Sequence, residues 1–131
     1  MISVSRRACL VMLALLAWAL MSGDAQAQQG GFPKTFKLNY AWSYTSLSQV
    51  PNISQWPEAV LTLKANGSID VVDQGTTYPN IGSWVKQGNQ ITFTFPSGGA
   101  VYSGIRQTNG TYNGTMSTTS GMYGVWKGKY Y

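Results

Sequence analysis

The sequence predicts an all-β protein, an up-and-down antiparallel meander of about eight strands that closes into a barrel. Two observations lead to this fold class. Apolar and polar side chains alternate over short segments from residue 34 onward, as they do in half-buried strands. Turns containing glycine, such as Asn66-Gly67, Gly88-Asn89 and Asn109-Gly110, separate these segments at the spacing of successive β-hairpins.

The first predicted strand carries its apolar side chains at even positions from Phe36 to Tyr44. A polar connection follows, and Pro57 suits the first turn of a short helix that begins near Ser54 or Gln55. The segments 59–64 and 69–72 then form the best-defined hairpin. After a predicted loop over 74–80, we expect the remaining strands at 81–87, 90–95, 101–107, 111–117 and 122–130.

The choice between a barrel and two packed sheets depends on strand number and on the connections. About eight strands can close into a barrel whose interior is filled by side chains or holds one small ligand. Closure removes the exposed edges that promote aggregation, and short connections favour pairing in chain order. A two-sheet β-sandwich is the alternative.

Residues 1–27 have the features of an export signal peptide. Arg6-Arg7 precedes an apolar run that is shorter than the roughly 20 residues of a spanning helix. Ala25-Gln26-Ala27 matches the small-x-small pattern at which signal peptidase cuts. We therefore expect a flexible leader at 28–33, a single domain at 34–131, and an exported protein, periplasmic or secreted, without membrane insertion after cleavage.

The composition argues against the common catalytic chemistries. The chain has no histidine, and its single cysteine, Cys9, lies in the predicted signal peptide. The usual general base, the thiol nucleophile and most zinc ligands are therefore missing. Among the few carboxylates, Asp70 and Asp73 point to opposite faces of a regular strand. We expect no enzymatic activity, no cofactor and no metal, and the scattered lysines favour no nucleic-acid partner.

Asn-x-Ser/Thr triplets begin at Asn52, Asn66, Asn109 and Asn113. Each is a glycosylation candidate in a eukaryotic secreted protein. Three of the four are Asn-Gly, the dipeptide that tight hairpin turns require because both residues tolerate positive φ. Turn chemistry explains the pattern without sugar.

The motif Gly-x-Trp occurs twice, as Gly82-Ser83-Trp84 and Gly124-Val125-Trp126. A Gly-x-Trp on a strand of a small exported meander barrel resembles the calycin group, the lipocalins and avidins, in which the tryptophan plugs one end of the barrel. In that group the motif lies on the first strand, whereas here it falls near the fourth and the last. In either case the glycine is expected to remove side-chain bulk beside the indole.

We expect a non-catalytic binding protein that holds a small apolar or amphipathic ligand in the barrel. Aromatic side chains facing inward supply apolar area and a hydrogen-bonding group, although core packing is their commoner role. The candidate ligand-binding residues are Tyr40, Trp42, Trp84, Tyr102, Tyr112 and Trp126. The alternative is a fully packed structural or interaction module that acts through a Thr/Ser/Asn-rich surface on a polysaccharide or protein partner.

Overall fold

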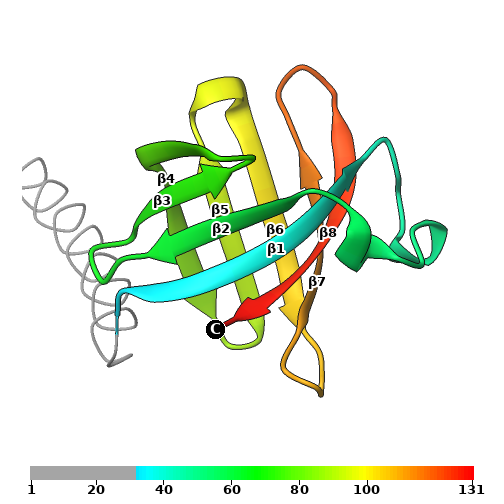
Figure 1. Cartoon of the computed structure of the whole chain (residues 1–131), viewed down its shortest axis with the longest axis horizontal. Helices are drawn as coiled ribbons and strands as arrows, with labels where there is room; N and C mark the ends of the chain where they lie inside the picture. Colours follow the sequence, from blue (N-terminus) through cyan, green and yellow to red (C-terminus); the bar gives the residue numbers. More distant parts are fainter. Residues whose placement is uncertain (1–31) are drawn as a thin grey trace, which may run out of the picture.

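A computed structural model describes residues 32–131, so the predicted signal peptide lies outside the described residues. The chain forms a closed barrel in which every strand pairs antiparallel with its neighbours in sequence order (Figure 1). The strands are β1 (Lys34–Trp42), β2 (Glu58–Leu63), β3 (Ser68–Asp73), β4 (Thr76–Gln87), β5 (Gln90–Phe95), β6 (Ala100–Arg106), β7 (Tyr112–Ser117) and β8 (Tyr123–Tyr130). The predicted eight-strand meander barrel is confirmed, and the sandwich is wrong.

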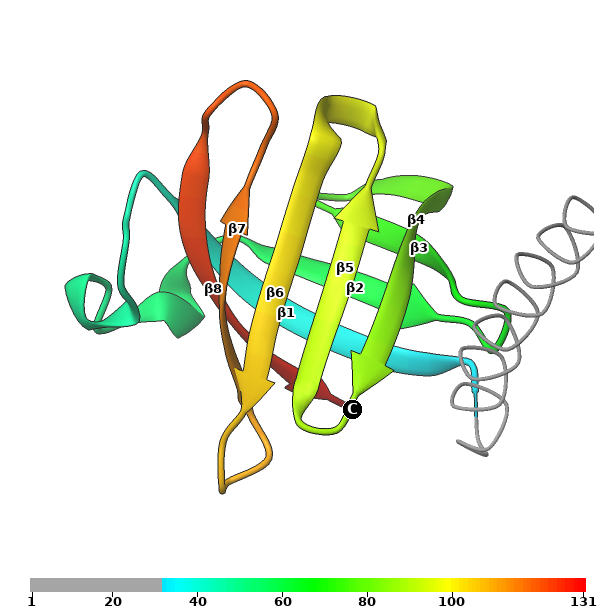
Figure 2. The same cartoon turned by 180° about the vertical axis from the view of Figure 1, so that it is seen from behind.

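Pairing of the first and last strands closes the barrel. The β1–β8 register runs from Phe36 opposite Tyr130 to Trp42 opposite Gly124. The wall formed by β1, β2 and β3 faces the viewer in Figure 1, and the opposite wall, with β5 and β6, faces the viewer in Figure 2. No strand of the barrel is left with an unpaired edge, so the sheet presents no free edge with which another chain could pair.

Strand β4 is longer than the sequence predicts. The expected loop over 74–80 is wrong, because β4 begins at Thr76 and Gln74-Gly75 alone makes the turn. Both turn residues have positive φ, 50° and 82°, which fits a tight two-residue hairpin. Strand β1 also differs, since it ends at Trp42 and leaves Tyr44 beyond the strand.

A bulge in β4 interrupts its pairing with β3. The register shifts between Ile69 and Val71, and the extra β4 residues include Asn80 with φ 50°. The Asp70 carboxylate accepts a hydrogen bond from the Asn80 backbone N–H at 2.7 Å and pairs with the Lys64 ammonium at 3.0 Å. The pKa of Asp70 is lowered, first by the bond from Asn80 and then by Lys64. This carboxylate therefore holds the bulge on the outer surface.

The helical turn predicted to begin near Ser54 or Gln55 starts earlier. The short turns are η1 (Leu47–Gln49), η2 (Ile53–Gln55) and η3 (Ser97–Gly99). Trp56, which precedes Pro57, is extended with φ −84° and ψ 165°, as expected before a proline, so η2 ends there. No helix within residues 32–131 is long and apolar enough to cross a membrane.

The β1–β2 connection (residues 43–57) covers part of the outer surface. Its Val50 and Ile53 are buried against Ala41 of β1 and Val125 of β8, and these four residues form a small second core. Ala41 and Val125 sit next to each other in the β1–β8 register, and their side chains point away from the barrel interior. The connection therefore buries the apolar pair Ala41 and Val125, which would otherwise face solvent.

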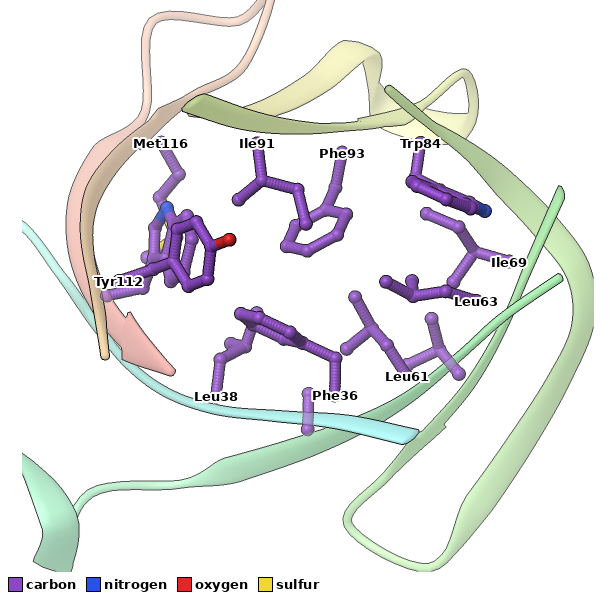
Figure 3. Close-up of a cluster of buried hydrophobic side chains, with 13 residues drawn as sticks. Phe36, Leu38, Leu61, Leu63, Ile69, Trp84, Ile91, Phe93, Tyr112 and Met116 are labelled. Atoms are coloured by element: carbon purple, nitrogen blue, oxygen red, sulfur yellow. The ribbon is translucent and has the colours of Figure 1, made fainter. Parts of the chain in front are cut away.

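The barrel interior is mainly packed with apolar side chains. Figure 3 shows them converging from both walls of the barrel. Phe36 lies at the centre of the aromatic part, with ring-centroid distances of 5.2 Å to Phe93, 5.7 Å to Tyr112, 6.1 Å to Trp126 and 5.2 Å to Tyr130. These rings meet edge to face, the arrangement that aromatic quadrupoles favour. The core therefore contains an aromatic cluster centred on Phe36, near the start of β1.

Candidate functional site

One end of the barrel is not filled. A cavity of about 260 Å³ lies where β1, β3 and β5 end and where β2, β4 and β6 begin. Its wall is largely apolar, with a few tyrosine hydroxyls and one carboxylate. The lining residues are Leu38, Tyr40, Ala59, Leu61, Val71, Asp73, Tyr78, Ile81, Phe95, Ser97, Ala100 and Tyr102.

Alternation along β3 places an acid on the inner wall. Ile69 and Val71 are buried in the core, so the next inward position is Asp73, at the end of the strand. Its two carboxylate oxygens each lie 3.0 Å from the Tyr40 hydroxyl, which donates to them from β1. A charged group and a phenol from opposite sides of β2 are thus joined at the cavity wall.

Two tyrosines of the cavity, Tyr40 and Tyr102, have raised pKa values. Burial raises the pKa of Tyr40 to about 12, and its hydrogen bond to Asp73 adds to the effect. Burial also raises the pKa of Tyr102, and the negative charge of Asp73 contributes in the same direction. Both phenols therefore remain hydrogen-bond donors at neutral pH.

The six aromatic residues predicted to bind a ligand fall into three groups. Tyr40 and Tyr102 line the cavity. Trp42 is half-buried and packs against the main core. The other three are fully buried in the packed interior and do not line the cavity: Trp84, Tyr112 and Trp126.

Trp84 closes the other end of the barrel. Its indole Nε1 donates to the Lys64 carbonyl at 2.8 Å, in the β2–β3 turn. The Phe32 ring stacks on the indole with centroids 4.9 Å apart, so the end of the predicted leader packs onto the barrel. Lys34 lies 5.3 Å from the centre of the Phe32 ring and 5.4 Å from that of Tyr130, at the same end. The barrel is therefore open at the end that holds the cavity and blocked by aromatic rings at the other end.

The glycines of the two Gly-x-Trp motifs do not make room for their own tryptophans. A Cβ on Gly82 would meet the Phe95 ring at 2.7 Å, and one on Gly124 would meet the Met116 methyl group at 2.5 Å. The expectation that each glycine clears space for the neighbouring indole is therefore wrong. The glycine and the tryptophan of each motif occupy successive positions on the same face of one strand. The side chain nearest to the glycine therefore comes from the adjacent strand and not from the tryptophan of the motif.

Sequence reasoning missed Asp73 as a site residue. The alternation of Ile69 and Val71 was sufficient to place it on the inner face, where an acid next to a core is unusual. Phe95 and Tyr78 were also missed. Tyr78 lay in the segment expected to be a loop, so strand alternation was not used to predict the direction of its side chain.

Two other features are less suited to be a site. A hollow of about 530 Å³ beside the β1–β2 connection is lined mostly by exposed residues such as Gln49, Pro51 and Asn52, outside the barrel. The remaining acids of the barrel, Glu58 and Asp70, lie on its outer surface. Within the described part of the chain, no three acidic, histidine or cysteine residues are grouped as a metal site requires.

Comparisons with protein-family models, curated proteins and solved structures found no match. What the structure shows is therefore an eight-strand, all-antiparallel closed meander with an aromatic cluster, an arrangement consistent with a calycin-like fold.

Proposed function

We propose that this protein is a non-catalytic, exported binding protein of calycin-like type, which holds a small amphipathic molecule in the open end of its barrel. The observation that carries the proposal is the apolar cavity with a few convergent polar groups, Tyr40, Tyr102 and Asp73. Binding sites for small molecules typically combine an apolar wall with a small number of placed polar groups.

The cavity size limits the ligand. Pockets for drug-sized molecules begin at roughly 300 Å³, and this cavity, at about 260 Å³, is slightly smaller. The molecule is therefore small, about the size of one aromatic ring with a short side chain. The packed aromatic cluster below the cavity sets its depth, because Leu38 and Leu61 form both the cavity wall and part of the core.

The proposal is tested by thermal unfolding in the presence of small hydrophobic and amphipathic compounds. A ligand that binds only the folded state must raise the melting temperature. We expect Ala100→Leu, which fills the cavity from its wall, to remove this rise. Ala65→Leu makes the same chemical change on an exposed turn residue and should leave the rise unchanged. If no compound of a broad panel changes the melting temperature of the natural protein or of either variant, the small-ligand function is wrong.

The second candidate is a module that acts through its outer surface. The register places uncharged residues side by side across four strands, in rows such as Val85, Thr92, Ser103 and Thr115. Val85 and Val101 are exposed on this face, with 39% and 40% of their surface accessible. An uncharged face with exposed aliphatic groups suits a polysaccharide or protein partner. Thr115→Lys, at the β7 end of this row, would weaken such binding and leave cavity binding intact.

A further inference from the structure

The ligand class follows from the charge inside the cavity, and this inference rests on the proposed function. We infer that the cavity selects a cationic amphiphile, a small molecule with an apolar or aromatic body and a protonated amine or quaternary ammonium group placed beside Asp73.

Asp73 is the single charged residue among the described residues that line the cavity. Within residues 32–131 it forms no ion pair, since the salt bridge of the barrel joins Lys64 to Asp70 on the outer surface. A carboxylate in a largely apolar site is costly unless a cation or hydrogen-bond donors compensate it. The Tyr40 hydroxyl supplies one donor, which holds the carboxylate in place. The remaining acceptor positions of its oxygens suit an ammonium group.

Four aromatic side chains line the same cavity as this carboxylate. Tyr40, Tyr78, Phe95 and Tyr102 all line the cavity, and the Phe95 and Tyr102 rings pack edge to face with centroids 5.4 Å apart. The face of an aromatic ring attracts a cation, and cages of such rings are the usual binding sites of quaternary ammonium groups. A carboxylate among several rings therefore favours a cationic head group over a neutral or anionic one.

The basic residues lie away from the cavity. Lys34 begins β1 and Lys86 lies near the end of β4, and the ammonium groups of both approach the Tyr130 ring at the blocked end, at 5.4 Å and 6.0 Å from its centre. No lysine or arginine of the described chain lines the cavity, so none lies there to neutralise Asp73 or to attract an anion. The charged group at the open end of the barrel is therefore the carboxylate of Asp73.

Three probes of similar size separate charge from shape: phenylethylamine, phenylethanol and phenylpropionate. Their dissociation constants are measured with the purified protein by calorimetry, and backbone NMR shifts locate each probe. We expect the amine to bind about tenfold or more tightly than the alcohol, with the carboxylate weakest. Shifts should concentrate near Asp73 and Tyr102 and leave the indole N–H signals of Trp84 and Trp126 unchanged.

Asp73→Asn keeps the size of the side chain and an oxygen that accepts from Tyr40. We expect it to remove the preference for the amine while the alcohol still binds. If the variant does not fold, the order of the three probes on the natural protein remains decisive. Equal affinities, or tightest binding of the carboxylate, would overturn the inference and leave the proposed cavity function standing. Shifts confined to the outer surface, or no binding of any probe, would overturn both.

Discussion

The indole of Trp126 lies directly against the backbone of Gly114 on the neighbouring strand. A Cβ at Gly114 would occupy the space of the indole Cε2 and Nε1 atoms. The same nitrogen donates to the Thr115 carbonyl at 3.0 Å, which fixes the ring over the strand. Gly104, on the far side of Gly114 in the register, leaves room for the outer edge of the ring. The indole of Trp126, one of the two buried tryptophans of the core, thus packs on two glycines, on β6 and β7.

This contact predicts that Gly114→Ala destabilises the protein by about 1–3 kcal/mol, the usual cost of overpacking a core. The ring cannot move away without losing its hydrogen bond to the Thr115 carbonyl. Chemical denaturation of the variant measures the free energy of unfolding. Thr115→Ala, on the exposed face of the same strand, is the matched control and should cost less than about 1 kcal/mol.

A double-mutant cycle separates the contact from other effects of alanine. In a Trp126→Phe background the smaller ring leaves space, so Gly114→Ala should cost clearly less than in the natural protein. Equal costs in both backgrounds would show that the Trp126–Gly114 contact is not the source of the destabilisation.

The two buried tryptophans should matter for stability rather than for ligand binding. Trp84 and Trp126 are 1% and 0% exposed, and neither lines the cavity. Truncating either residue to alanine should lower the free energy of unfolding by about 3–5 kcal/mol through cavity formation. The melting temperature of each variant measures this loss. A melting temperature that is unchanged by Trp84→Ala would show that the blocked end contributes nothing to stability.

Their fluorescence gives a second measurement. Because both indoles belong to the packed interior, a ligand in the cavity should not alter their emission, which changes only when the protein unfolds. Single-tryptophan variants that retain Trp84 or Trp126 test this during titration with a bound probe. A strong change of Trp84 emission on binding would place the ligand at the blocked end instead.

Local patterns predicted the fold well because the alternation of apolar and polar residues within each strand, and the glycine-containing turns between strands, can be recognised in short segments. Three hairpins use the same five-residue turn, at 64–68, 107–111 and 118–122, with a glycine of positive φ in its fourth position. In two of them the side-chain oxygen of Asn66 or Asn109 accepts from the backbone N–H and the hydroxyl of the residue two positions on. Turn chemistry therefore accounts for these two Asn-Gly-Ser/Thr triplets, but the same explanation is wrong for Asn113-Gly114, which lies inside β7.

The candidate site was predicted only in part, because it depends on where the core stops. Alternation shows that Tyr40 and Trp84 both face inward, but it does not show which end of the barrel is filled. Which end is filled depends on contacts between distant segments, such as the stacking of Phe32 on Trp84. The packing of Trp126 on Gly114 similarly needs the β7–β8 register, which a single strand does not reveal.

The turn at Asn66-Gly67 provides a test of local backbone strain. Gly67 has φ 88°, and its N–H donates to the Lys64 carbonyl at 3.0 Å. Gly67→Val places a β-branched side chain in this region and should cost about 1–3 kcal/mol. Ala65→Val, in the same turn but exposed, should change the stability by less than about 0.5 kcal/mol. Urea midpoints of the two variants give the comparison, and equal midpoints would refute the role of positive φ at this turn.

The raised pKa values of the buried tyrosines predict a loss of stability at alkaline pH. In the unfolded chain a tyrosine ionises near its ordinary pKa of 10.0, whereas folded Tyr40 holds its proton until about 12. Below pH 10 both states are protonated, so Tyr40 introduces no pH dependence there. Between pH 10 and about 12 the unfolded state releases the proton first, and the free energy of unfolding must fall as the pH rises. Burial raises the pKa of Tyr102, Tyr112 and Tyr130 in the same direction.

The urea midpoint across this pH range measures the loss, and the absorbance of tyrosinate follows the ionisation itself. Tyr40→Phe removes one of the contributing phenols, so the decline of its midpoint should be shallower than that of the natural protein. Tyr123→Phe, which removes an exposed tyrosine, is the matched control. A midpoint that stays constant from pH 10 to 12 would contradict the prediction, because it requires the folded and unfolded chains to release their phenolic protons together.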